Sequence, residues 1–175
     1  MRIVLLSLAL AATLNAAPLT WVLENAAFTD GGTATGWFVF DADTEQVLSY
    51  SILTSGGNTS VFPAFLFQNG APDNLGAYYD PYNGGFMFDS SFTNGYPDDL
   101  QLRLAPVGGV LTDAGGVLSL DLNSPWQAEC YNCSPYRVFQ SGELSSTPEP
   151  GSGLMALLAA ALTLAGRQAS RRARG

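Results

Sequence analysis

The chain has 175 residues, of which 47% are hydrophobic and 13% are charged. It contains no lysine and no histidine, which excludes Ser-His and Cys-His catalytic pairs and imidazole ligands for zinc. Residues 18–149 hold all fifteen acidic residues but only two arginines, Arg103 and Arg137. The resulting formal charge of −13 excludes nucleic acid as a partner, because phosphate contacts need cationic side chains.

The first segment has the three parts of a secretory signal peptide. Arg2 supplies a positive start, residues 3–14 form an apolar run, and the small residues Ala16 and Ala17 follow. We therefore predict a signal peptide over residues 1–16, removed by signal peptidase after the chain enters the general export machinery.

The middle of the chain is typical of an all-β domain. Short aromatic and branched segments alternate with Gly, Asn, Asp and Pro, and the turn Asp30-Gly31-Gly32 precedes the second of them. Leu100, Leu102 and Leu104 share one face of a strand, and so do Leu118, Leu120 and Leu122. The strands are expected at 19–24, 36–42, 47–54, 61–68, 85–90, 100–105, 117–122 and 136–144. This pattern predicts a jelly-roll-like antiparallel β-sandwich of about eight strands.

Aromatic residues lie among Asp, Asn and Gly in segments that we expect to form loops. They are Tyr78, Tyr79, Tyr82, Tyr96 and Trp126. Loops of this composition are common in carbohydrate-binding surfaces, where flat rings stack on sugars. The alternative is that the rings pack half-buried on the domain with wet hydroxyl groups. No cofactor is predicted; calcium held by Asp oxygens is an alternative, although the spacing of a calcium loop is absent.

Cys130 and Cys133 are the only cysteines. In an exported, oxidising setting we predict that they form a disulfide that closes a small loop. A redox role would need a helix N-terminus beside the thiols, and a metal site would need further soft ligands; the sequence predicts neither.

The last segment is apolar and then basic. Residues 151–166 carry no charge and would make a helix of roughly 24 Å, against roughly 30 Å of hydrocarbon in a bilayer. Arg167, Arg171, Arg172 and Arg174 follow, and such a cluster marks the end that stays in the cytoplasm. We therefore predict a single C-terminal helix that serves as a membrane anchor.

Pro148, Glu149 and Pro150, followed by this helix and the arginine cluster, resemble the PEP-CTERM sorting signal of exported bacterial proteins. The resemblance implies recognition by an exosortase, a membrane protease that acts near the triplet. The opening "AAFTDGGTATGWFVFDADT" (26–44) resembles a group of such proteins without known activity. The implied parts are a signal peptide (1–16), an exported β-domain (17–147) and a sorting signal (148–175). The implied location is a tether at the inner membrane, followed by the cell surface or the extracellular space.

Three functions remain open. The first is a cell-surface or extracellular-matrix protein, sorted by exosortase, associated with exopolysaccharide and without catalytic activity. The alternative is a carbohydrate-binding module, with or without calcium. A glycoside-acting enzyme comes third, because it needs two carboxylates in defined roles and no motif identifies such a pair.

Overall fold

The computed structural model describes residues 17–146. The predicted signal peptide and the predicted sorting signal lie outside the described residues. Residues 17–146 contain strands and turns, and no helix among them is long and apolar enough to cross a membrane. The predicted all-β class is therefore confirmed for the described domain.

The domain contains ten β-strands. They are β1 (Leu19–Phe28), β2 (Gly32–Asp41), β3 (Gln46–Gly56), β4 (Phe65–Gln68), β5 (Asn74–Asp80), β6 (Gly85–Ser90), β7 (Leu100–Leu104), β8 (Gly116–Ser119), β9 (Ala128–Tyr131) and β10 (Tyr136–Ser146). Each of the eight predicted strands overlaps one of these. Strand β5 lies in a segment that we expected to form a loop, and no strand was expected at β9. The Asp30 turn is confirmed, since Gly31 has a φ of 86° and the Asp30 carboxylate accepts the Gly32 N–H.

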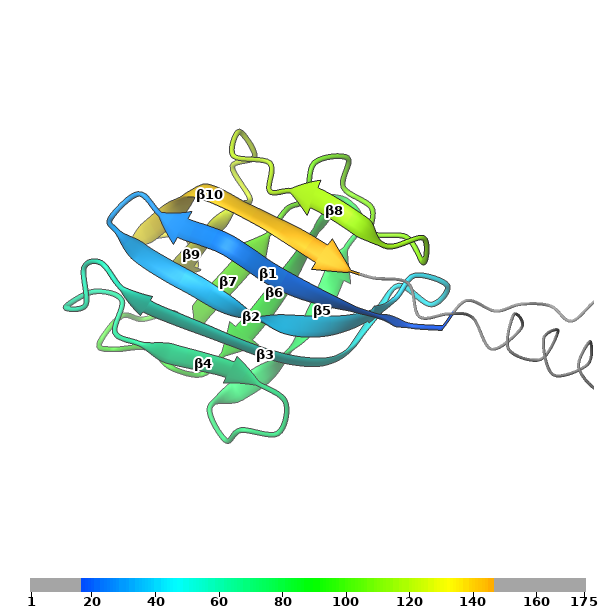
Figure 1. Cartoon of the computed structure of the whole chain (residues 1–175). Helices are drawn as coiled ribbons and strands as arrows, with labels where there is room; N and C mark the ends of the chain where they lie inside the picture. The colour runs from blue at the N-terminus through cyan, green and yellow to red at the C-terminus, as the bar shows by residue number, and fades with distance from the viewer. Residues whose placement is uncertain (1–16, 147–175) are drawn as a thin grey trace, which may run out of the picture. The chain divides into compact units, whose positions relative to one another are not determined.

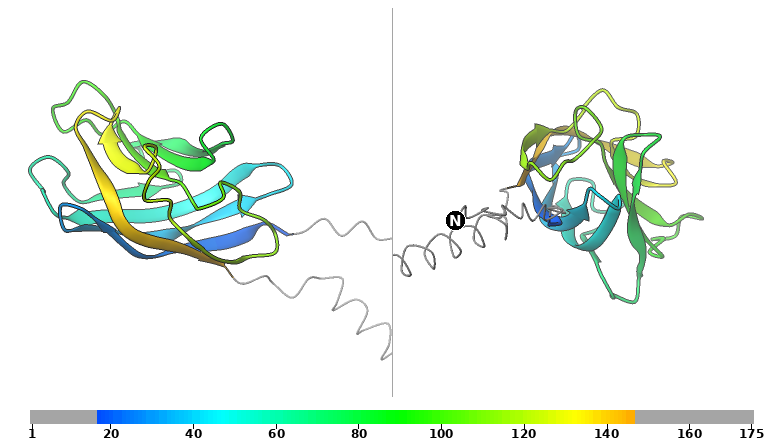
Figure 2. Two further views of the ribbon diagram at one scale, coloured as in Figure 1. Left: turned by 90° about the horizontal axis from the view of Figure 1, so that it is seen from above. Right: turned by 90° about the vertical axis from the view of Figure 1, so that its right-hand side faces the viewer.

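The strands pair in one antiparallel sheet, in the order β4-β3-β2-β1-β10-β9-β7-β6-β5, with β8 also paired to β10. The sheet bends back on itself, so that β1–β4 cover one side of the core and β5, β6, β7 and β9 cover the other (Figures 1 and 2). Strand β3 approaches β5, and β4 approaches β6, which leaves the sheet nearly closed into a barrel. The start of β10 pairs with β9 and its later part with β1 and β8. Because β10 joins the two halves, the predicted sandwich arrangement is not confirmed.

The core follows from alternation along the strands. Leu100, Leu102 and Leu104 are fully buried, as predicted, and so are the two Phe residues of β6. Burying a side chain of this size contributes roughly 1.5–3 kcal/mol. The prediction for the other leucine triplet was only partly right: Leu120 is buried, but β8 ends at Ser119 and Leu122 is exposed. The alternation ends with the strand, which is why the triplet does not share one face.

Candidate functional site

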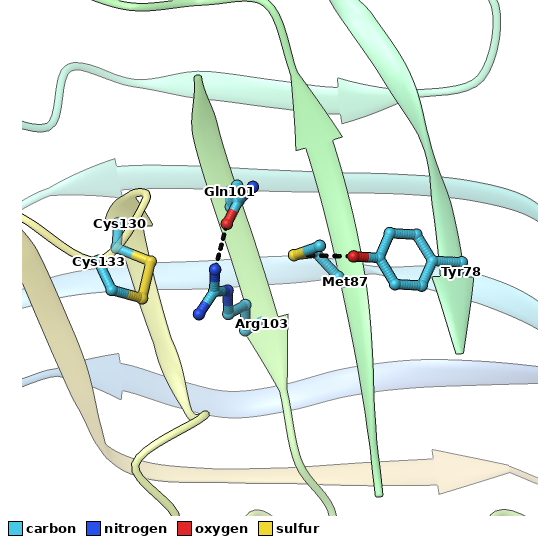
Figure 3. The surroundings of a disulfide bond; sticks show 6 residues. All are labelled: Tyr78, Met87, Gln101, Arg103, Cys130 and Cys133. Atoms are coloured by element: carbon cyan, nitrogen blue, oxygen red, sulfur yellow. Dashed lines mark hydrogen bonds between the residues drawn. A yellow bond between two sulfur atoms is a disulfide. The ribbon is translucent and has the colours of Figure 1, made fainter. Parts of the chain in front are cut away.

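Strands β5, β6, β7 and β9 turn every second side chain away from the core, and we call this surface the outer face. The register of the strands aligns its side chains in two rows. One row contains Tyr78, Met87, Arg103 and Ala128, and the next contains Gly76, Asp89, Gln101, Cys130 and Tyr136. Figure 3 shows Tyr78, Met87, Gln101, Arg103 and the disulfide on this surface. The outer face therefore combines aromatic, charged and amide groups on a rigid support.

Arg103 lies in the middle of the outer face. Its guanidinium carbon is 4.5 Å from the centroid of the Trp126 ring, within the range of a cation–π contact. One amino group donates a hydrogen bond to the Gln101 side-chain oxygen. Within residues 17–146, no carboxylate lies within 4.0 Å of the guanidinium. Arg103 is thus held in position by a ring and an amide, without a charged partner.

Trp126 reaches the outer face from the segment before β9, and Gly85 makes room for it. A Cβ at position 85 would lie 2.7 Å from the indole nitrogen and 2.8 Å from the Leu104 carbonyl oxygen. These distances are shorter than any normal contact, so the indole can cover β6 only because residue 85 is glycine. The indole N–H is buried and has no hydrogen-bond partner among the described residues.

Tyr78 forms the other aromatic side of the outer face. Its side chain is 45% exposed, and its hydroxyl donates to the Met87 sulfur at 3.6 Å. Met87 is only 7% exposed although it points away from the core. Part of the outer face is therefore packed like an interior, which fixes the position of the Tyr78 ring.

The ionisable groups of the outer face are perturbed by burial and by one another. Burial raises the pKa of Asp89, and the charge of Asp99 adds to this, against the opposing effects of hydrogen bonds and of Arg103. Burial lowers the pKa of Arg103, although a guanidinium stays protonated in proteins. Burial and the charges of Asp89 and Asp80 raise the pKa of Tyr78, which keeps its hydroxyl neutral.

The predicted aromatic residues do not lie together. Tyr78 and Trp126 flank the outer face, but Tyr79 points inward, packs on Phe40 and Phe86, and donates to the Gly109 carbonyl. Tyr82 is 94% exposed in the turn between β5 and β6. Tyr96 stacks on Tyr131 at a ring distance of 4.6 Å.

A second group of polar side chains lies at the end of the domain where β1 meets β2 and β9 meets β10. We call this group the buried polar cluster: Thr54, Glu129 and Arg137 are buried, and Asp30 contacts Arg137 from the exposed turn before β2. Arg137 is 3% exposed and lies 2.5 Å from Glu129, 3.3 Å from Asp30 and 3.0 Å from the Gly56 carbonyl oxygen. The Thr54 hydroxyl donates to the other Glu129 oxygen at 2.6 Å. The guanidinium also lies over the rings of Phe28 and Phe62.

The contacts within the buried polar cluster indicate a structural role. Burial raises the pKa of Glu129, against the opposing effects of Arg137 and Thr54. The pKa of Asp30 is lowered. Burial alone would raise it, but hydrogen bonds from the backbone of Asn58 and Gly32 and the charge of Arg137 outweigh this effect. The cluster connects four segments that are far apart in the sequence, and its polar atoms contact one another.

The cysteines are paired, as predicted. Cys130 and Cys133 form a disulfide with a Cα–Cα distance of 4.4 Å in the turn that joins β9 to β10. Within residues 17–146, no group of three or more His, Cys, Asp or Glu side chains is arranged to hold a metal ion.

Sequence reasoning missed Met87, Asp89, Gln101 and Arg103 as neighbours of Tyr78 and Trp126. One signal was available, because in "LQLRL" the alternation that buries the leucines must turn Gln101 and Arg103 outward. The pairing of β7 with β6 and β9, which completes the outer face, has no local signal.

The chain matches no protein-family model, no curated protein and no solved structure.

Proposed function

We propose that the protein is an exported, non-catalytic protein of the cell surface or extracellular matrix, whose β-domain binds exopolysaccharide on its outer face. The observation that carries this proposal is the placement of Tyr78 and the Arg103–Trp126 pair on one surface of the sheet. Tyr78 and Arg103 are two strands apart, which corresponds to roughly 10 Å. This separation suits stacking on neighbouring sugars of one chain.

The chemistry between the two aromatic sides supports a saccharide ligand. Gln101, Arg103 and Asp89 offer donors and acceptors to hydroxyl groups, and the rings offer flat apolar surfaces. These groups stand on paired strands, so little conformational entropy is lost when a ligand binds. The signal peptide and the sorting signal would deliver the domain to a place where polysaccharide is present.

The arrangement of carboxylates favours binding over catalysis. Glycoside hydrolysis requires two carboxyl groups on opposite sides of the scissile bond. The charge of Asp99 acts on Asp89, and Asp80 on β5 already accepts hydrogen bonds from Tyr82 and Asn83 in the turn. The hydrogen bonds of Asp80 support a role for this residue in turn formation rather than in a catalytic pair.

Binding can be tested with exopolysaccharide purified from the producing cells and protein recovered from the same cells. Tyr78→Ala and Trp126→Ala should each weaken binding about tenfold, which corresponds to about 1.4 kcal/mol. Trp37→Ala is the matched control, because Trp37 is 38% exposed on β2, in the other half of the sheet, close to the 45% of Tyr78. Equal losses in all three variants, or no binding by the wild type, would refute the proposal. Adding EDTA distinguishes calcium-assisted binding from binding without calcium. EDTA should weaken the first and leave the second unchanged.

Delivery is tested separately by the intact mass of the protein recovered from cells. We expect a product that begins near residue 17 and ends near the Pro148-Glu149-Pro150 triplet. Recovery of the full-length chain from the cytosol would rule out both export and exosortase processing.

A further inference from the structure

We infer that the bound saccharide is acidic, and that Arg103 binds its anionic group. This inference rests on the proposed function, because it names the class of ligand for the same outer face. The ligand class is a saccharide that carries uronate carboxylates or sulfate esters, and Tyr78 and Trp126 would hold the sugar rings on either side of the contact.

The two arginines of the domain differ in their charged partners. Residues 17–146 contain fourteen acidic side chains and only Arg103 and Arg137. Arg137 is enclosed in the buried polar cluster and has two carboxylate partners. Arg103 has none within 4.0 Å among the described residues, although carboxylates outnumber arginines seven to one there. A surface arginine in so acidic a domain would ordinarily find a carboxylate neighbour, so its isolation leaves a charge available to a ligand.

The contacts of Arg103 fix the orientation of its guanidinium group. The Trp126 ring supports one face of the guanidinium, and Gln101 accepts from one of its amino groups. Its Nε is buried, whereas its other amino group is neither buried nor hydrogen-bonded within the described part of the chain. A guanidinium fixed in this manner presents donors in a constant direction, which suits recognition of a carboxylate or sulfate oxygen.

Asp89 is the carboxylate whose charge acts on Arg103. Gln101 stands opposite Asp89 in the register, and Arg103 stands opposite Met87. Asp89 is therefore displaced by one row from Arg103, and no ion pair forms between them. Asp89 is also half-buried, and burial raises its pKa more than the charge of Arg103 lowers it.

The net charge of the domain determines which probe is suitable. Fourteen acidic residues against two arginines repel a long polyanion at low ionic strength, whereas charges beyond roughly 8 Å are largely screened at 0.15 M salt. Short oligosaccharides at this salt concentration therefore report the local contact with Arg103 rather than the field of the whole domain.

The test compares trigalacturonic acid with its methyl ester, which has the same rings without the charge, by calorimetry on the protein recovered from cells. We expect the acid to bind at least tenfold more tightly than the ester. Arg103→Gln should abolish this preference, because it removes the charge and leaves only a neutral amide donor on a shorter side chain. Arg103→Lys should keep part of it, since the charge stays but the planar donor set is lost. A sulfated trisaccharide in the same assay identifies the source of the anion.

The outcomes separate the two proposals. Equal binding of acid and ester, lost in Tyr78→Ala, would refute the acidic ligand and leave saccharide binding intact. A preference for an acidic probe that persists in Arg103→Gln would refute the role of Arg103. Binding of neither the acid, the ester nor the sulfated probe, together with no binding of exopolysaccharide, would refute both proposals. Circular dichroism of each variant checks that the fold is retained.

Discussion

Arg103 and Arg137 are the two arginines of the described domain; both lie over aromatic rings, but they differ in burial and in charged partners. Arg137 is buried, pairs with Glu129 and Asp30, and donates to a backbone carbonyl. Arg103 stands on the outer face and contacts a ring and an amide. The residue type is the same, but one guanidinium is neutralised inside the protein and the other is not.

The difference shows how a nearly closed sheet divides its polar groups. Glu129 and Arg137 point inward from β9 and β10, where each needs the other to offset the cost of removing charge from water. Gln101 and Arg103 point outward from β7, where both side chains are partly exposed. The inward-pointing Arg137 therefore stabilises the fold, whereas the outward-pointing Arg103 is available for binding.

The largest expected effect distinguishes the two arginines by stability. Arg137→Met leaves Glu129 as a buried, unpaired charge, and such losses cost about 3–5 kcal/mol. Arg103→Met should cost less than about 1 kcal/mol, because no ion pair is broken. Urea unfolding followed by tryptophan fluorescence measures both. Similar losses in the two variants would contradict the comparison, and the double variant Arg137→Met/Glu129→Leu should recover part of the loss.

A smaller effect is expected from the disulfide next to the buried polar cluster. Cys130 follows Glu129 directly, and its partner Cys133 is three residues further on. The loop-closure relation for a ring of this size gives about 2 kcal/mol of stabilisation. The double variant Cys130→Ser/Cys133→Ser should lose this amount and become insensitive to reductant. A wild type whose unfolding midpoint does not respond to reductant would contradict the expectation.

The smallest effect is a difference in pH dependence between Asp30 and Asp89. The pKa of Asp30 is lowered in the folded state, so its ionised form stabilises the protein above its ordinary pKa, and this stability is lost as pH falls through the lowered value. The pKa of Asp89 is raised, so stability is lost as pH rises through the raised value. Asp30→Asn should therefore be less stable than the wild type at neutral pH, and Asp89→Asn more stable.

Urea unfolding at a series of pH values measures the free energy of unfolding of each variant relative to the wild type and so checks the two expected directions. Both differences from the wild type should shrink in acid, where the carboxyl groups are protonated in the folded and unfolded chains alike. Two shifts of the same sign at neutral pH would contradict the assignment of opposite environments.

Much of the fold could be predicted because alternation is a local property. In β7, apolar residues at every second position identify the strand and its buried side at once. Strand β5 could not be recognised, because Asn, Gly and Asp surround its two tyrosines and resemble a loop. Strand β9 is four residues long and completely buried, so it shows no alternation, and it runs into the disulfide turn.

The candidate site was less predictable than the fold. Tyr78 and Trp126 stood out by residue type, but nothing in the sequence separates Tyr78 from its neighbour Tyr79, which points inward. One position in a strand decides between the two faces. The buried polar cluster could not be predicted from the sequence either, because Asp30 and Arg137 are 107 positions apart.

The position of β10 has a mechanical consequence. Near Ser146, where the described chain ends, Ser145 is paired with Val22 of β1 and with Val117 of β8. A force applied through the C-terminal end therefore acts along a strand with hydrogen-bonded neighbours on both sides, and many bonds must shear together before it detaches. If a polysaccharide is held on the outer face and the C-terminal end is pulled, detachment of β10 should require more force than peeling of the short edge strand β4.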